Sequence, residues 1–468
     1  MKKLNRKTVS LTPERPIRII QFGEGNFLRG FVDWMIDILN EKTNFNGNIQ
    51  IIQPLQKGMG EWINEQDGLY HVLLEGLEKG SKIQTTRLIT SASGVLNPFE
   101  NYKAFLELGE NPHLEFIISN TTEAGIIFDE NDHSSTSLPK TFPGKLTALL
   151  YHHFISFNEH PPNELNILPC ELIEKNGDKL KECVLRYIEL WSLSKKFAQW
   201  LEHSVVFYNT LVDRIVPGFP KENIKTIQEK LGYEDNLVVK AEPFHLWVIE
   251  GPTELKDILP LNEAGLNAIF TNDLTPFRTR KVQILNGTHT AMVPIAYLKG
   301  FKEVRDVVED KKMIEFLNQI IFKEIIPTLD MPKKELDTYA HEVLERFKNP
   351  FIKHKLLDIS LNSISKFKVR VLPSVLTYIE KYHKVPQGLA TAFSYLIVFY
   401  SGQYDSQIIP INDDQAVTAF FREALNTDDL ELAVNTILSN ESLWDQNLIE
   451  KTLLSIFLKE KVKDILSD

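Results

Sequence analysis

Three polar residues in the segment KVQILNGTHTAMVP, namely Lys281, Asn286 and His289, have the side chains needed to move a proton and hold a reacting oxygen. On an α-helix, Asn286 lies about 140° and His289 about 80° from Lys281, so all three can face one cleft. Apolar neighbours flank them, so the helix is expected to be largely buried. A desolvated lysine has a lowered pKa, which suits a general acid or base. The alternative is a lysine at a helix edge beside a buried, hydrogen-bonded Asn and His.

A glycine-containing turn, QFGEGNFLRGF, begins at the end of an expected strand over residues 17–22. A strand, a turn with Gly23 and Gly25, and a helix start are the arrangement that binds the pyrophosphate of a dinucleotide. The third glycine of the usual fingerprint is displaced, because Leu28 holds its position and Gly30 comes two residues later. The alternative is a turn that starts a helix and binds no ligand. The residues expected to bind the cofactor here are Phe22, Gly23, Glu24, Gly25, Asn26, Phe27 and Arg29.

The ends of two further expected strands carry candidate residues for binding the cofactor. The second strand of a dinucleotide-binding fold normally ends in an acidic residue that binds the adenosine ribose, but IQIIQPLQKG has Gln53 there. Gln53 can bond a ribose hydroxyl and the nearby Lys57 suits a 2′-phosphate, so these residues leave NAD and NADP open. The strand LEFIISNT is followed by SNTTEAGI at the sheet edge where ligands bind. Its candidates are Asn120, Thr121 and Glu123, of which Glu123 can equally cap the next helix.

The order of the segments indicates two domains. In the first half, strand-like segments alternate with helix-like ones, which is typical of a mostly parallel sheet with helices on both faces. The segments after about residue 262 have helical periodicity. We therefore expect an α/β Rossmann-like domain over residues 1–262 and an all-α domain over residues 263–468. Lys281 lies just past this junction, and ligand clefts are common between domains. The strands are expected at residues 17–22, 49–55, 114–121 and 165–172.

The composition is that of an ordinary globular protein, 43% hydrophobic and 25% charged. A net charge of −11 argues against a nucleic-acid or anionic-membrane surface. Two cysteines give neither a disulfide framework nor a CxxC metal site, and a reducing cytoplasm is the simpler setting. No apolar stretch approaches the roughly 18 residues of a membrane span. We therefore expect a cytoplasmic protein that acts on a small molecule, without a nucleic-acid, membrane or obligate protein partner.

Several motifs in order resemble the mannitol dehydrogenase family of polyol-specific long-chain dehydrogenases. They lie between about Ile17 and Tyr400: QFGEGNFLRGFVDWMIDILNE, SNTTEAGI, ILPCELIEKNGD, NTLVDRIVPGFP, KVQILNGTHTAMVP and RFKNPFIKHKLLDISLNSISKFKVRVLP. The family's catalytic signature, Lys-x4-Asn-x2-His, falls on Lys281, Asn286 and His289. The resemblance implies a Rossmann-like domain, a helical domain, NAD as the cofactor and hydride transfer without a metal. It also implies that Lys281 is the general acid or base while Asn286 and His289 hold the oxygen.

A departure from the family pattern bears on the substrate. Polyol-oxidising members usually read Cys-Asp-Asn where this chain has Cys170, Glu171 and Leu172, whereas Asn176 and Gly177 match. The sequence PCEL is shared with the uronate-reducing branch. The resemblance thus implies reversible, NADH-dependent reduction of tagaturonate to altronate in hexuronate (galacturonate) catabolism. Fructuronate reduction and mannitol-type polyol oxidation are the alternatives, and an NAD-binding uronate epimerase is the alternative from another class.

A uronate substrate requires a cation for its carboxylate. Lys366 falls at the family's substrate-side lysine, and Arg370 and Lys368 are close to it in sequence. The alternative for this cluster is a solvated basic face of a helix. The residues expected to bind substrate are Asn176, Lys366 and Arg370.

Overall fold

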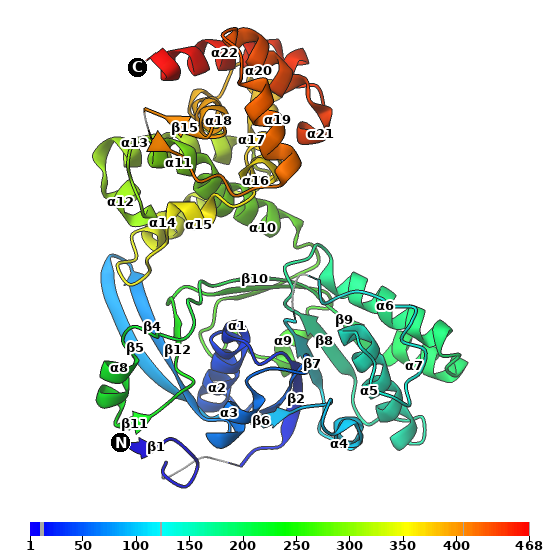
Figure 1. Cartoon of the computed structure of the whole chain (residues 1–468). Coiled ribbons are helices and arrows are strands. Elements are labelled where there is room, and N and C mark those ends of the chain that lie inside the picture. The colour runs from blue at the N-terminus through cyan, green and yellow to red at the C-terminus, as the bar shows by residue number, and fades with distance from the viewer. Residues whose placement is uncertain (10–13, 122–123, 406, 468) are drawn as a thin grey trace. The chain divides into compact units, whose positions relative to one another are not determined.

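The computed structural model describes residues 1–9, 14–121, 124–405 and 407–467. The chain divides into two compact units, which are described separately. Unit 1 comprises residues 1–78 and 82–274, and unit 2 comprises residues 79–81 and the chain from 275 onward. Unit 1 combines strands with helices, whereas unit 2 is largely helical (Figure 1), so the expected fold class is confirmed. The division falls between Leu274 and Thr275, compared with the expected boundary after residue 262.

A six-stranded parallel sheet forms the centre of unit 1, with the order β6-β3-β2-β7-β8-β9. Counted along the chain, this is the 3-2-1-4-5-6 order of dinucleotide-binding sheets. The strands are rich in Ile, Val and Leu, as strands buried on both faces require. They span Ile17–Phe22 (β2), Asn48–Ile52 (β3), Ala92–Leu96 (β6), Phe116–Ser119 (β7), Leu165–Pro169 (β8) and Val205–Phe207 (β9).

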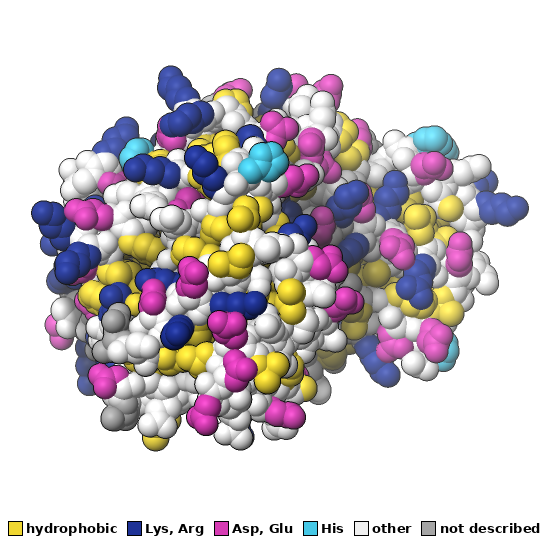
Figure 2. All heavy atoms as spheres, turned by 90° about the horizontal axis from the view of Figure 1, so that it is seen from above, with side chains coloured by type: hydrophobic (Ala, Val, Ile, Leu, Met, Phe, Trp, Pro, Cys, Tyr) yellow, Lys and Arg dark blue, Asp and Glu magenta, His cyan; other side chains and the backbone are white. Residues whose placement is uncertain are grey.

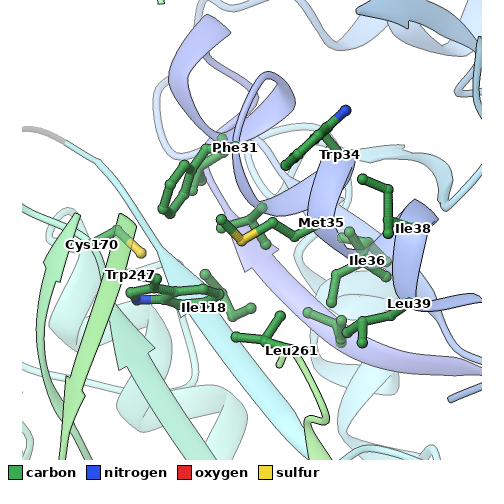
Figure 3. Close-up of a cluster of buried hydrophobic side chains, with 14 of the residues drawn as sticks. Phe31, Trp34, Met35, Ile36, Ile38, Leu39, Ile118, Cys170, Trp247 and Leu261 are labelled. Atoms are coloured by element: carbon green, nitrogen blue, oxygen red, sulfur yellow. The ribbon is translucent and has the colours of Figure 1, made fainter. Parts of the chain in front are cut away.

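Successive residues of these strands pack into different hydrophobic clusters, because side chains alternate between the faces of a sheet. Ile118 of β7 packs with helix α2, Val32–Lys42, whereas its neighbour Ile117 packs with α5, Phe142–Ser156. Figure 3 shows the first cluster, in which Met35 and Leu39 of α2 lie near Trp247 of β13. Both faces of the sheet are therefore covered, and the strand ends remain to form a ligand site.

Smaller sheets in unit 1 are β12-β4-β5 and β10-β13-β14, with the pair β1-β11. Lys79 and Gly80 join β4 to β5 with φ values of 50° and 78°, which is the hairpin turn that matches strand twist. The strands span Lys2–Lys3 (β1), Tyr70–Glu78 (β4), Ser81–Ile89 (β5), Asn209–Asp213 (β10), Tyr233–Glu234 (β11), Val239–Ala241 (β12), Leu246–Glu250 (β13) and Ala268–Thr271 (β14); the helices span Asn26–Arg29 (α1), Gly60–Glu65 (α3), Tyr102–Glu107 (α4), Leu108–Glu110 (η1), Asn176–Leu190 (α6), Lys195–Ser204 (α7), Ile224–Leu231 (α8) and Leu255–Ile258 (α9).

Unit 2 is built around α18, Gln387–Phe399, whose apolar side chains are buried against α11 and α22. A helix that is apolar on most sides is typical of a helical core. The other elements are Thr275–Arg280 (α10), Lys281–Asn286 (η2, π-helical), Gly287–Leu298 (α11), Val304–Glu309 (α12), Lys311–Gln319 (α13), Ile320–Ile325 (η3, π-helical), Ile326–Thr328 (η4), Lys333–Phe347 (α14), Leu356–Ile359 (α15), Ser363–Arg370 (α16), Leu372–Tyr382 (α17), Gln403–Tyr404 (β15), Gln407–Ile408 (β16), Gln415–Ala424 (α19), Leu430–Ser439 (α20), Glu441–Trp444 (α21), Leu448–Glu450 (η5) and Thr452–Ser467 (α22).

The surface drawn in Figure 2 carries basic and acidic side chains interspersed, without a large field of one sign. Across the described residues, no helix combines the length and the apolar character that a membrane span needs. The same part of the chain contains no group of three or more His, Cys, Asp or Glu side chains that could hold a metal ion.

Candidate active site

The π-helical segment η2 changes the angles between the three candidate catalytic residues. In a π-helix, residue i bonds to residue i+5, so these two residues lie about one turn apart on the same face. Lys281 and Asn286 are the first and last residues of η2. Their side chains therefore lie on one face instead of about 140° apart, as in an α-helix. His289 follows in α11, about 60° from Asn286, so one side of a continuous helix carries all three.

His289 is buried and held between two rings. Its imidazole stacks on Phe347, with ring centroids 4.1 Å apart, and His354 contacts it edge-on at 4.9 Å. Burial lowers the pKa of His354, while the carboxylate of Asp358 opposes this shift. The two rings restrict the orientation of the His289 imidazole, as a group that must bond a reacting oxygen requires. The sequence reasoning missed Phe347 and His354, although both lie in the motif RFKNPFIKH.

Residues at the end of α16 and at the start of α17 contact α11 and η2. A Cβ atom at Gly287 would lie 2.8 Å from the carbonyl oxygen of Arg370, so a glycine is needed where α16 ends against α11. Ser374 at the start of α17 donates a hydrogen bond of 2.9 Å to the side-chain oxygen of Gln283 in η2. These contacts bring the C-terminal end of the basic helix α16 next to the segment that carries the candidate catalytic residues.

The candidate cations of α16 differ in their surroundings. Lys366 donates to the carbonyl oxygen of Ile359 at 2.9 Å. Burial lowers the pKa of Lys366, and the nearby positive charge of Arg370 lowers it further. Lys368 forms an ion pair with Asp445, with 3.0 Å between Nζ and Oδ1. Lys366 and Arg370 thus lie close together, whereas Lys368 is directed to an exposed carboxylate.

The two glycines of the N-terminal turn have different surroundings. Gly23 has a φ of 122°, and a Cβ atom there would lie 2.9 Å from the carbonyl oxygen of Asn120 and 3.2 Å from Leu28 Cδ1. Gly25 has a φ of −67°, and no atom lies within 4 Å of the position that its Cβ would occupy. Gly23 is therefore required by the fold, whereas Gly25 leaves space beside the turn for a ligand.

The aromatic residues of the turn contact the protein. Phe22 is fully buried and its ring lies 4.9 Å from that of Phe142. Phe27 is partly buried and stacks on Phe31 at 5.1 Å. The ring of Phe22 is part of the core, so the contact with the cofactor stays a prediction that concerns the backbone of Phe22.

Arg29 is also a structural residue. Its side chain has no exposed surface, and its guanidinium donates to the carbonyl oxygens of Glu24 at 3.1 Å and Leu237 at 2.7 Å. It also donates to the side-chain oxygen of Asn26 at 2.8 Å. The guanidinium therefore holds the turn in shape and occupies an acceptor of Asn26, and the contact of Arg29 with the cofactor stays a prediction.

The loop after β3 closes around Gln53. Its amide nitrogen donates to the carbonyl oxygens of Leu55 at 2.8 Å and Gln56 at 3.1 Å, and its oxygen accepts from the N–H of Gly60 at 3.2 Å. Both amide hydrogens are therefore used within the loop, so Gln53 has only acceptor capacity left for a ribose. A cavity of about 280 Å³ opens beside this loop, and its lining includes Gln53 and Lys57.

The ends of β7 and β8 are tied together. Asn120 donates to the carbonyl oxygen of Cys170 at 2.7 Å. The backbone N–H and the hydroxyl of Thr121 donate to the buried carboxylate of Glu171, at 2.9 and 3.0 Å. Glu171, the departure noted in the sequence, thus fixes the strand end beside the glycine turn. Glu123 lies outside the described residues.

Asn176 is surrounded by backbone groups of the protein. Its side chain is fully buried, and its amide nitrogen donates to the carbonyl oxygens of Pro169, Glu171 and Thr210 at 2.9, 3.0 and 3.1 Å. Its oxygen accepts from the N–H groups of Thr210 at 2.8 Å and Gly177 at 3.0 Å. The protein uses all of these groups, which gives Asn176 a structural role, and the contact with substrate stays a prediction.

Comparison with known proteins gives consistent matches along the chain. The model for the mannitol dehydrogenase Rossmann domain matches residues 17–262, and that for the mannitol dehydrogenase C-terminal domain matches residues 273–466. An altronate oxidoreductase of Phocaeicola vulgatus is 46% identical over 451 residues, which cover 96% of this chain and 94% of that protein.

Two solved structures share the fold over nearly the whole chain. A D-sorbitol dehydrogenase in substrate-free form has a TM-score of 0.80 at 22% identity, covering 98% of this chain and 100% of that one. The mannitol 2-dehydrogenase of Pseudomonas fluorescens, in a ternary complex with NAD and D-mannitol, has a TM-score of 0.72 at 20% identity, covering 99% and 96%. At such identities the likeness concerns the fold.

Proposed function

The chain belongs to the mannitol dehydrogenase family, and from this premise we propose that it catalyses the NAD-dependent altronate oxidoreductase reaction. In the reducing direction, tagaturonate, NADH and a proton give altronate and NAD⁺, in the breakdown of hexuronates such as galacturonate. The observation that carries this proposal is the 46% identity to an altronate oxidoreductase over 96% of the chain.

The C-terminal end of β2 fits a dinucleotide. The open space beside Gly25 admits a pyrophosphate next to backbone N–H groups, and the cavity at Gln53 lies where the adenosine ribose binds in this fold. When bound, the nicotinamide supplies a hydride to the carbonyl carbon of the substrate and accepts one from the alcohol in the reverse direction.

Residues of unit 2 supply the remaining chemistry. Lys281, as an ammonium group, donates a proton to the substrate ketone oxygen, and as a neutral amine it accepts the hydroxyl proton in the reverse reaction. Asn286 and His289 donate hydrogen bonds to the same oxygen and stabilise the negative charge that develops on it. The shared face that the π-helix creates supports this assignment. Lys366 and Arg370 bind the substrate carboxylate.

A panel of substrates tests the proposal. The purified protein is incubated with NADH or NADPH and with tagaturonate, fructuronate or fructose, and the nicotinamide absorbance is followed. We expect the highest kcat/KM for tagaturonate with NADH. A preference for fructuronate or fructose would contradict the proposed substrate. Conversion of a uronate without net change in absorbance would indicate an epimerase instead.

A further inference from the structure

The acidic residue that normally ends the second strand of this fold, and that binds the adenosine ribose of NAD, is Gln53 in this chain. The structure shows that Gln53 cannot replace it fully. Both of its amide hydrogens bond to loop carbonyls, and its oxygen already accepts from Gly60. The neutral amide also lacks the charge that repels the 2′-phosphate of NADP. A group that selects between the two cofactors must therefore come from another residue.

The carboxylate of Glu24, the residue between the two glycines of the turn, reaches the same place. A Cβ atom built on Gly58 would overlap Glu24 Oε1, and it would lie 2.7 Å from Gln53 Cδ and 2.8 Å from Gln53 Oε1. The Glu24 carboxylate and the Gln53 amide therefore converge on Gly58, which lines the cavity of about 280 Å³ at the end of β3. The glycine is what allows the two groups to approach each other.

The Glu24 carboxylate has capacity to bind a ligand. It accepts a hydrogen bond from the N–H of Met59 at 3.4 Å, which is long for such a bond, and another from its own backbone N–H. An ionised carboxylate offers about four acceptor positions, so about two of them remain for ribose hydroxyls. The residue is 9% exposed, and its burial raises the pKa of the carboxyl. A charge in such surroundings is screened little by salt.

We propose that Glu24 is the residue that selects NAD over NADP: its carboxylate accepts hydrogen bonds from the adenosine ribose and repels a 2′-phosphate. This inference rests on the proposed function, because it assumes a dinucleotide in unit 1. Lys57, which lines the cavity beside Gln53 and Gly58, has the opposite charge and would favour a 2′-phosphate. Lys57 is exposed, however, so solvent and salt weaken its field more than that of the nearly buried Glu24.

The test compares binding of NAD⁺ and NADP⁺ by isothermal titration calorimetry in the wild type, Glu24→Gln and Glu65→Gln. The first variant keeps the shape of the side chain and removes its charge. Glu65 is an exposed carboxylate at the end of α3 that does not line the cavity of about 280 Å³, so its variant makes the same chemical change outside the proposed ribose site. We expect the ratio of Kd for NADP⁺ to Kd for NAD⁺ to fall at least about tenfold in Glu24→Gln and to change about twofold or less in Glu65→Gln, because charge effects decay with distance and exposure.

Several results would overturn the assignment. One is a wild type that binds NADP⁺ as tightly as NAD⁺. Another is a parallel loss of both affinities in Glu24→Gln, which indicates that Glu24 merely braces the loop at Met59. A third is an equal change of the ratio in Glu65→Gln. If Glu24→Gln does not fold, Glu24→Ala is measured instead. The comparison of the affinities of the wild type for NAD⁺ and NADP⁺ still tests the proposal without any variant. A wild type that binds neither dinucleotide refutes the proposed function, whereas tight NAD⁺ binding with an unchanged ratio in the variant refutes only the role of Glu24.

Discussion

Replacing Gly23 with alanine should destabilise unit 1. At a φ of 122°, an L-residue is strained by about 1–3 kcal/mol. The new methyl group would also lie 2.9 Å from the Asn120 carbonyl oxygen and 3.2 Å from Leu28 Cδ1. Overpacking of this kind costs about 1–3 kcal/mol. We therefore expect the free energy of unfolding to fall by about 2–6 kcal/mol, measured by urea denaturation with circular dichroism and intrinsic fluorescence.

Gly25→Ala is the matched control, with the same chemical change two residues away. Its φ of −67° suits alanine and its Cβ meets no atom within 4 Å, so stability should change by less than about 1 kcal/mol. The added methyl group instead fills the space proposed for the pyrophosphate, and we expect the Kd for NAD⁺ to rise at least about tenfold. Equal unfolding free energies for Gly23→Ala and the wild type would refute this reasoning about the turn.

Three other expectations concern stability and catalysis. Burial raises the pKa of Asp33 from 3.8 to about 6. The free energy of unfolding should therefore fall by about 3 kcal/mol as the pH rises from about 4 to about 6, and this contribution should stay constant at higher pH. Asp33→Asn should remove this pH dependence in urea unfolding at pH 4 and 7, whereas an unchanged difference between the two pH values would contradict it. Phe347→Leu removes the ring that stacks on His289, and it should lower kcat about tenfold while the Kd for NADH stays constant in fluorescence titrations. Lys366→Met removes a proposed cation, so KM for tagaturonate should rise at least about tenfold; a KM equal to that of the wild type would assign the carboxylate to another residue.

Much of the sheet was predictable because its strands have strong local signals. The strand β2 begins and ends at the predicted residues 17 and 22, since the apolar run IRIIQF is bounded by Pro16 and Gly23. The strand β3 ends at Ile52, before the predicted residue 55. Pro54 lacks a backbone N–H for the ladder, and the side chain of Gln53 bonds to the loop that follows.

The geometry of the candidate site was less predictable, because it depends on packing between distant segments. Nothing in the letters KVQILN distinguishes a π-helix from an α-helix. The contact of Gly287 with the backbone of Arg370 and the bond between Gln283 and Ser374 are tertiary. For the same reason, the sequence does not show whether a polar residue near a motif binds a ligand or another part of the protein. Arg29 and Asn176 have suitable side chains for a ligand, yet the protein uses them internally.

The most direct test of the account is the turnover of Lys281→Ala with NADH and tagaturonate, beside its affinity for NADH. Proton transfer by a positioned side chain contributes about 10²–10⁴-fold to rate. We therefore expect kcat to fall by at least about a hundredfold while the Kd for NADH remains within about twofold of the wild type. Near-normal turnover in this variant would contradict the assignment of Lys281 as the proton donor, and with it the mechanism built on the π-helical face.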